Sequence, residues 1–262
     1  MTGPTPLPNS NSDRRLCHAL RALRPTAIPT AAAPADEPTS DEPVVKCAIF
    51  GAGGHARRAH APNLRTLPGV EIVAIVDTNT ELAQQLADDF APAARLYTDG
   101  HAMLAAEPEL DALFSVVPAF VRAVGVEAAA ALKGVHLFSE KPQTLDMPTA
   151  NAIASAVAEG GVVSSVGFRE RYRPLFRAAK AYLADKETVH CSFRNFGGLA
   201  GDAVDPSEWT RWNDDFSKSG GTMFDWGCHA VDVSSAANPP SHLETRLTSL
   251  PSSRCVCLCA HC

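Results

Sequence analysis

Short apolar β-like runs that alternate with helical segments constrain the fold of this chain more than any other feature. The predicted strands are Val44–Phe50, Val70–Val76, Arg95–Tyr97, Ala112–Val117, Val135–Phe138 and Val162–Val166. Nearly continuous apolar strands fit a parallel sheet that is covered on both faces, and right-handed crossovers make that sheet doubly wound. We therefore predict an α/β fold in which residues 44–166 form a nucleotide-binding domain of the Rossmann type.

The segments between these strands predict helices. A helix follows the turn after the first strand, and another begins at Gly100. Three more are expected at Thr80–Phe90 (with Thr80 as N-cap), Ala119–Lys133 and Asp146–Glu159.

The turn after the first strand has the spacing of a dinucleotide-binding fingerprint. Its sequence, Gly51-Ala52-Gly53-Gly54-His55-Ala56, opens a helix. The first glycine turns the chain, the second lets the backbone approach a pyrophosphate, and the small residue at 56 lets helix and strand pack closely. We expect residues 51 and 53–56 of this turn to bind the cofactor; the alternative is a tight β-to-α turn without a ligand.

Asp77 ends the second strand, at the distance from the glycine turn where such domains place an acidic residue. Its carboxylate can accept hydrogen bonds from ribose hydroxyls and would repel a 2′-phosphate, which favours NAD over NADP. The alternative is that Asp77 only caps the following turn.

Glu140-Lys141-Pro142 directly follows the fifth predicted strand. Open α/β sheets bind ligands at the carboxyl ends of their strands, so the Lys141 ammonium can meet a substrate oxygen there. A solvated charged turn is the alternative interpretation.

The run Ser219–Asp232 contains a glycine pair followed by Asp225 and His229, four residues apart. That spacing places the carboxylate and the imidazole on one face of a helix, where the acid can orient the ring for proton transfer. A hydrogen-bonded structural histidine is the alternative.

Beyond Gly167 the alternation ends, and residues 167–240 predict only part of a second α/β domain. A helix is expected at Arg171–Leu183, a strand at Thr188–Phe196 and a second helix near Gly220. A single strand cannot form a stable sheet. Residues 241–262 form a cysteine-rich tail that we expect to lack structure, and its spacing does not predict a zinc site, so no metal is expected.

Residues 1–43 are rich in Pro, Ala, Ser and Thr, which predicts a disordered extension. A net charge of −6 and the lack of a long apolar run argue against a nucleic-acid or membrane partner. We expect a cytoplasmic protein, or an organellar one if the basic segment Arg14–Arg24 acts as a transit peptide.

Taken together, these motifs resemble the Gfo/Idh/MocA oxidoreductases, a family named for glucose–fructose oxidoreductase and inositol dehydrogenase. The glycine turn, Asp77, Glu140-Lys141-Pro142 and the Asp225/His229 run occur in the family's order. Supporting matches are His60-Ala61-Pro62, Val117-Pro118 and Gly167-Phe168-x-x-Arg171, and the similarity covers residues 44–238.

The resemblance implies hydride transfer between NAD(P) and a sugar, cyclic polyol or related alcohol. His229 would be the general base, Asp225 would orient it, and Lys141 would hold the substrate oxygen. Pro118, Glu140 and Lys141 would contact the cofactor, while Arg171 and Trp212 would lie near the substrate. The family's second domain has a large sheet that often forms the oligomer interface, and most of it is missing here, so we expect a truncated second domain. A homo-oligomer stays possible. The alternatives are a non-catalytic NAD(P)-binding sensor, or an inactive fragment.

Overall fold

The computed structural model describes residues 44–184, 190–194, 215–221, 223–237 and 255–259. All of them belong to one compact unit, Pro38–Cys262. The predicted extension 1–43, most of the tail and Trp212 lie outside the described residues. No helix in the described ranges is long and apolar enough to cross a membrane.

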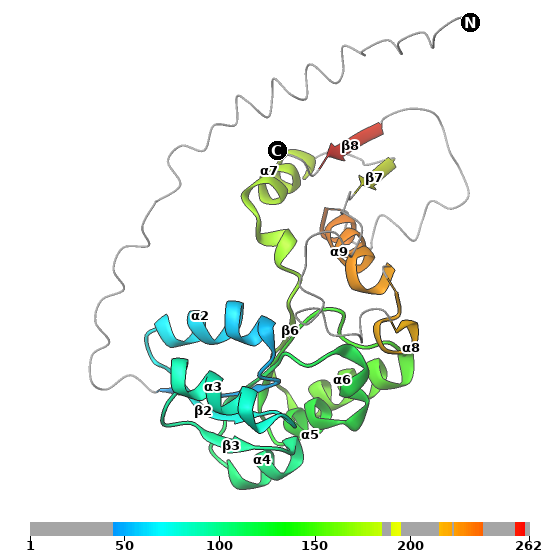
Figure 1. The fold of residues 1–262 in the computed structure, drawn as a ribbon. Coiled ribbons are helices and arrows are strands. Elements are labelled where there is room, and N and C mark those ends of the chain that lie inside the picture. The colour runs from blue at the N-terminus through cyan, green and yellow to red at the C-terminus, as the bar shows by residue number, and fades with distance from the viewer. Residues whose placement is uncertain (1–43, 185–189, 195–214, 222, 238–254, 260–262) are drawn as a thin grey trace, which may run out of the picture. The chain divides into compact units, whose positions relative to one another are not determined.

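A six-stranded parallel sheet dominates the described chain, and Figure 1 labels three of its strands, β2, β3 and β6. The strands run in the order β3-β2-β1-β4-β5-β6. The strands are β1 (Val45–Phe50), β2 (Val70–Val76), β3 (Arg95–Tyr97), β4 (Ala112–Ser115), β5 (His136–Ser139) and β6 (Ser164–Val166). This order confirms the predicted doubly wound sheet, and it reverses direction between β1 and β4. Ligands bind at such a reversal, outside the carboxyl ends of the strands.

Helical segments connect successive strands. They are η1 (Ala56–His60), α2 (Ala61–Thr66), α3 (Thr80–Phe90), α4 (Gly100–Ala106), η2 (Ala119–Val124), α5 (Val126–Leu132) and α6 (Met147–Gly160). The first of these, η1, is a π-helix, in which the Ala61 N–H bonds to the Ala56 carbonyl.

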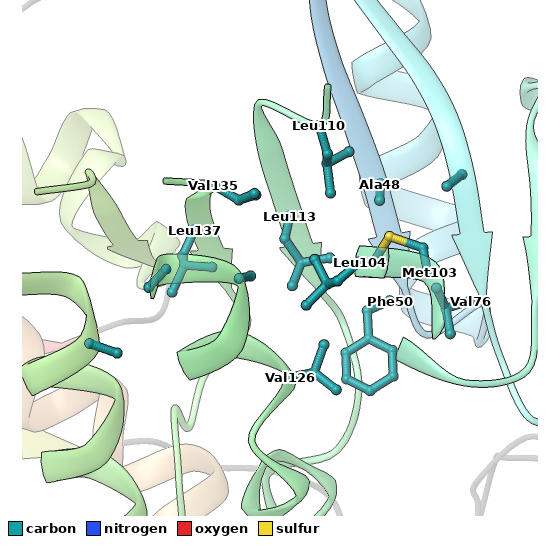
Figure 2. Close-up of a cluster of buried hydrophobic side chains, with 14 of the residues drawn as sticks. Ala48, Phe50, Val76, Met103, Leu104, Leu110, Leu113, Val126, Val135 and Leu137 are labelled. Atoms are coloured by element: carbon teal, nitrogen blue, oxygen red, sulfur yellow. The ribbon is translucent and has the colours of Figure 1, made fainter. Parts of the chain in front are cut away.

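Alternate residues of β1 pack into two separate cores, because successive side chains of a strand point to opposite faces. Ala48 and Phe50 join Met103 and Leu104 of α4 and Val126 of α5 in one cluster, which Figure 2 shows. Cys47 and Ile49 lie on the other face, in a cluster that includes buried residues of α2 and α3. Burial on both faces explains why the central strands β1 and β2 are largely apolar.

Two local predictions differ from the structure. Asn79, not Thr80, is the N-cap of α3, and its side-chain oxygen accepts from the N–H groups of Glu81 and Leu82. The helix predicted at 119–133 is divided into η2 and α5 at Gly125, which has a left-handed φ of +80°. Asparagine is among the strongest N-cap residues, and glycine adopts positive φ without a steric penalty.

After β6 the chain forms η3 (Arg169–Tyr172), α7 (Pro174–Leu183) and β7 (His190–Arg194). It continues in α8 (Phe216–Ser219), the π-helix η4 (Met223–Gly227), α9 (Cys228–Ala237) and β8 (Cys255–Cys259). Strand β8 pairs with β7 in parallel, so this part of the tail is a strand and not unstructured. An extended partner for the exposed edge of β7 satisfies backbone groups on both segments.

Candidate active site

The glycine turn lies where the strand order reverses, beside the end of β4. Gly51 has φ +102°, and a Cβ there would approach the carbonyl oxygen of Val116 and a methyl group of Val117 to 3.0 Å. A side chain at 51 is therefore excluded by conformation and by space. Its N–H donates to the Val76 carbonyl at 2.8 Å, which ties the turn to β2.

Asp77 braces the same turn. Its Oδ2 accepts from the Ala52 N–H at 2.7 Å, and its Oδ1 accepts from the Asn79 N–H at 2.8 Å. A carboxylate has about four acceptor positions, so both oxygens retain capacity for ribose hydroxyls. The two interpretations of Asp77 are therefore compatible: it supports the turn and remains able to bind a ligand.

Apart from the chain neighbours of Gly53, no atom of the described residues lies within 4 Å of the position that a Cβ would occupy there. Gly53 stands just before the helical segment, whose first N–H groups have no partner within the helix. Open space in front of these donors, with Asp77 alongside, fits the pyrophosphate and ribose of a dinucleotide.

Two histidine side chains contact the Glu140 carboxylate. Its Oε1 lies 3.0 Å from His55 Nε2 and 2.8 Å from His60 Nε2, while Oε2 accepts from the Lys141 N–H at 3.1 Å. Burial alone would raise the pKa of Glu140, but hydrogen bonds with the two imidazoles outweigh burial and hold the pKa well below its usual range. Glu140 is therefore a carboxylate at neutral pH. His60 was not among the predicted site residues, because α-helical spacing does not place residues 55 and 60 together.

Lys141 reaches a residue that is distant in sequence. Its Nζ donates to Asp225 Oδ1 at 2.6 Å and to the Asp225 carbonyl at 2.8 Å. Both side chains are about one-fifth exposed, and the ammonium also lies 5.7 Å from the Trp226 ring centroid. The structure thus brings together two of the three predicted catalytic residues.

His229 is buried in the same region, with 6% of its surface exposed. Its ring lies edge-on to Phe168 and tilted to Trp226, at centroid distances of 6.1 and 6.4 Å. Burial, followed by the charge of Lys141, lowers the pKa of His229 below its ordinary value. The imidazole is therefore neutral near pH 7, as a general base must be.

The Asp225 carboxylate contacts Lys141, and no hydrogen bond joins it to His229 within the described residues. Orientation of His229 by Asp225, which the resemblance implied, is therefore not present in this arrangement. The physical reason is that a nearby ammonium attracts a carboxylate more strongly than a neutral imidazole does. His229 Nδ1 is buried without a hydrogen-bond partner in the described chain.

The two residues predicted near the substrate have different outcomes. The Arg171 guanidinium forms a two-pronged ion pair with the buried Asp232, in which Nε lies 2.9 Å from Oδ2 and Nη2 contacts Oδ1. Arg171 therefore links η3 to α9 in this structure. Trp212 lies outside the described residues.

The sequence did not predict a buried ion pair between Arg122 and Glu127. Arg122 and Glu127 are 1% and 0% exposed, and Ser115 Oγ donates to Glu127 Oε1 at 2.5 Å. Arg122 donates to the carbonyls of Val117 at 3.0 Å and Gln143 at 3.2 Å. It therefore joins the loop that contains Pro118 to the loop that follows Lys141. In the sequence Arg122 resembles an ordinary solvent-exposed arginine on a helix, so nothing indicated that it is buried.

Comparison with known proteins agrees with this geometry. Residues 45–168 match the model of the GFO_IDH_MocA family, described as "Oxidoreductase family, NAD-binding Rossmann fold". The chain is 28% identical over 190 residues to scyllo-inositol 2-dehydrogenase (NAD(+)) of Bacillus subtilis strain 168, covering 72% of this chain and 52% of that enzyme. It is 32% identical over 163 residues to inositol 2-dehydrogenase of Pseudomonas syringae pv. syringae strain B728a, covering 58% and 46%.

Solved structures give the same result for the fold. GenD2 from gentamicin A biosynthesis, in complex with NAD, superposes with a TM-score of 0.64 at 26% identity, covering 77% of this chain and 55% of that one. The WlbA (WbpB) dehydrogenase from Thermus thermophilus has a TM-score of 0.60 at 22% identity, covering 74% and 63%. The chain spans about half the length of the curated relatives it matches.

Proposed function

We propose, since the chain belongs through residues 45–168 to the Gfo/Idh/MocA oxidoreductase family, that it transfers a hydride between NAD(P) and the hydroxyl-bearing carbon of a small molecule. The substrate class that its relatives suggest is a cyclic polyol or sugar. The alternatives are a cofactor sensor and an inactive fragment.

The main supporting observation is the contact between Lys141 and Asp225, with His229 one helical turn further along. Lys141 follows β5 at the sheet edge where the glycine turn lies, so the contact joins this edge of the sheet to the segment with His229. A sensor needs neither a buried neutral imidazole nor a partly buried ammonium at this position. An alcohol dehydrogenase uses both.

The roles of the residues follow from their chemistry. The dinucleotide, when bound, supplies the hydride acceptor. Lys141 has three N–H donors and uses two of them on Asp225, so the third can hold the substrate oxygen as charge develops there. The neutral imidazole of His229 accepts the hydroxyl proton at a ring nitrogen. Asp225 positions the ammonium.

The cofactor is NAD, or NADP as the second choice. Asp77 presents a carboxylate at the end of β2, where a 2′-phosphate would be repelled and two ribose hydroxyls would be bound. NAD is also the cofactor named for the B. subtilis inositol dehydrogenase and found in the GenD2 complex.

The proposal is tested with the full chain in two measurements. The first is thermal stabilisation by NADH and by NADPH; we expect the larger shift with NADH. The second is formation of NADH from NAD with scyllo-inositol, myo-inositol and a panel of aldoses, compared with His229→Ala. Dinucleotide binding with turnover that depends on His229 supports an enzyme. Binding without turnover on any member of the panel supports the sensor. Lack of binding contradicts both and supports an inactive fragment.

A further inference from the structure

His55, His60 and Glu140 form a three-donor cluster at the mouth of the glycine turn. The two Nε2 atoms lie 3.0 and 2.8 Å from the same carboxylate oxygen, and one ligand atom from each residue lies within 4.8 Å of the others. Two imidazoles and one carboxylate are a ligand set that zinc commonly has in proteins. The dinucleotide contacts expected of His55 and Glu140 do not require His60, which approaches the same carboxylate oxygen.

The π-helix η1 brings the two histidines together. Residues five apart are on different faces of an α-helix, whereas the wider π turn stacks them on one face. Here the ring centroids of His55 and His60 are 5.2 Å apart. Pro62 stands two residues after His60 and has no N–H to donate to the Arg58 carbonyl in α-helical spacing, which favours the wider turn.

We propose that His55, His60 and Glu140 bind a divalent transition-metal ion, with zinc the best-suited ion and one coordination position left open. Ligand atoms around tetrahedral zinc stand about 3.3 Å apart, given metal–ligand bonds of about 2.0–2.2 Å. The observed separations of 2.8 and 3.0 Å need to open by only a few tenths of an ångström.

The surroundings of the cluster support such a site. Glu140 is anchored by its second oxygen, which accepts from the Lys141 N–H. The His60 side chain is 12% exposed, and its ring packs 5.3 Å from Phe138 and 6.4 Å from Phe114 by centroid. The His55 side chain is 46% exposed and leaves an entry path for the ion. Two ligands held by packing or hydrogen bonds and one accessible ligand meet the usual requirements of a metal site.

The test must separate this cluster from the tail cysteines, because thiolates are also ligands of transition metals. The probe is Co²⁺, titrated into the full-length chain in which Cys255, Cys257, Cys259 and Cys262 are replaced by Ser. We expect one equivalent to bind, with visible d–d bands and no thiolate charge-transfer band. His55→Asn and Glu140→Gln should each weaken Co²⁺ binding by about 10-fold or more, since each removes one of three ligands.

His101→Asn is the matched control, because His101 is exposed and bonds to the Val124 carbonyl away from the cluster. It should bind Co²⁺ as the parent does. His55→Asn changes a side chain that is half exposed, so it should leave the fold intact, and its thermal midpoint verifies this. Unchanged affinity in both His55→Asn and Glu140→Gln overturns the proposal, as does a parent that binds Co²⁺ only while its tail cysteines are present. The measurement uses no dinucleotide, so its outcome is independent of the proposed enzyme activity.

Discussion

Lys141 Nζ lies 2.6 Å from Asp225 Oδ1, although 84 residues separate the two in sequence. The same ammonium donates to the Asp225 carbonyl, so the end of β5 is tied both to the backbone and to the side chain of η4. The contact therefore joins the parallel sheet to the segment that contains His229, and its removal should affect stability as well as catalysis.

Lys141→Met and Asp225→Asn should each lower the free energy of unfolding by about 1–3 kcal/mol, the range for hydrogen bonds to charged groups that are partly buried. The double variant should lose less than the sum, because the two residues act on one interaction. Urea denaturation measures all three. Glu109→Gln is the control: it removes the exposed Lys46–Glu109 pair and should leave the midpoint unchanged. Additive losses at 141 and 225 would contradict a direct coupling.

His229→Ala should reduce kcat by about 10²- to 10⁴-fold, because it removes the positioned proton acceptor. NADH affinity should change little, since His229 lies outside the glycine turn. Steady-state kinetics and NADH titration distinguish the two effects. A matching loss of NADH affinity would instead indicate a structural histidine.

The pH dependence of kcat/KM should report the same residue. Burial and Lys141 lower the pKa of His229, so the acid limb should fall below the ordinary histidine value of 6.5. His229→Gln should abolish that limb. The stability should also depend on pH, because the unfolded chain protonates His229 at higher pH than the folded chain does. The stability due to neutral His229 is therefore present above pH 6.5 and decreases as the pH falls below it.

Gly53→Ala should weaken NADH binding at least about 10-fold and leave the thermal midpoint almost unchanged. Within the part of the chain that the structure describes, the added Cβ meets no atom within 4 Å beyond its chain neighbours. The fold therefore accepts it, but it occupies the space in front of the turn. Gly51→Ala is the contrasting variant, because its Cβ would meet Val116 and its φ is +102°. It should lower the midpoint strongly. Equal NADH affinity in Gly53→Ala and the parent would mean that no phosphate approaches this turn.

Arg122→Met should destabilise the chain by about 3–5 kcal/mol, because it leaves the fully buried Glu127 carboxylate without its cation. Adding Glu127→Gln should restore part of the loss by removing the unpaired charge. Arg57→Met provides the control, since the Arg57–Asp89 pair is nearly half exposed. Thermal or urea denaturation of the parent and the three variants tests the prediction. A double variant less stable than Arg122→Met would count against it.

The sequence predicted the sheet well because periodicity and burial are local signals. The boundaries of β2 and α3 agree with the structure at both ends, and the glycine turn, Asp77 and Lys141 lie at the sheet edge where they were expected. Such residues are recognisable because strand ends and tight turns restrict which side chains fit.

Pairings across the fold were not predictable in the same way. Asp225 and His229 have helical spacing, yet the carboxylate bonds to Lys141, which only the tertiary fold brings near. His60 was noted only as part of a matching motif and not as a site residue, because α-helical spacing does not bring it beside His55, whereas a π turn does. The burial of Arg122 was not predicted, because nothing in the neighbouring sequence indicates that this end of the helix is buried in the fold.

The π-helices η1 and η4 also determine which side chains of the following α-helices face the core. Each turn holds one residue more than an α-helical turn would, and each lies directly before an α-helix. If the same residues of η1 formed a regular α-helix, with none removed, every later side chain would be rotated by about 100°. Ala61 and Leu64 of α2 would then turn away from the core that they fill. The extra residue in the π turn therefore sets the direction of the side chains that follow it. His55 and His60 face Glu140, while the apolar residues of α2 in the same helical segment face the sheet.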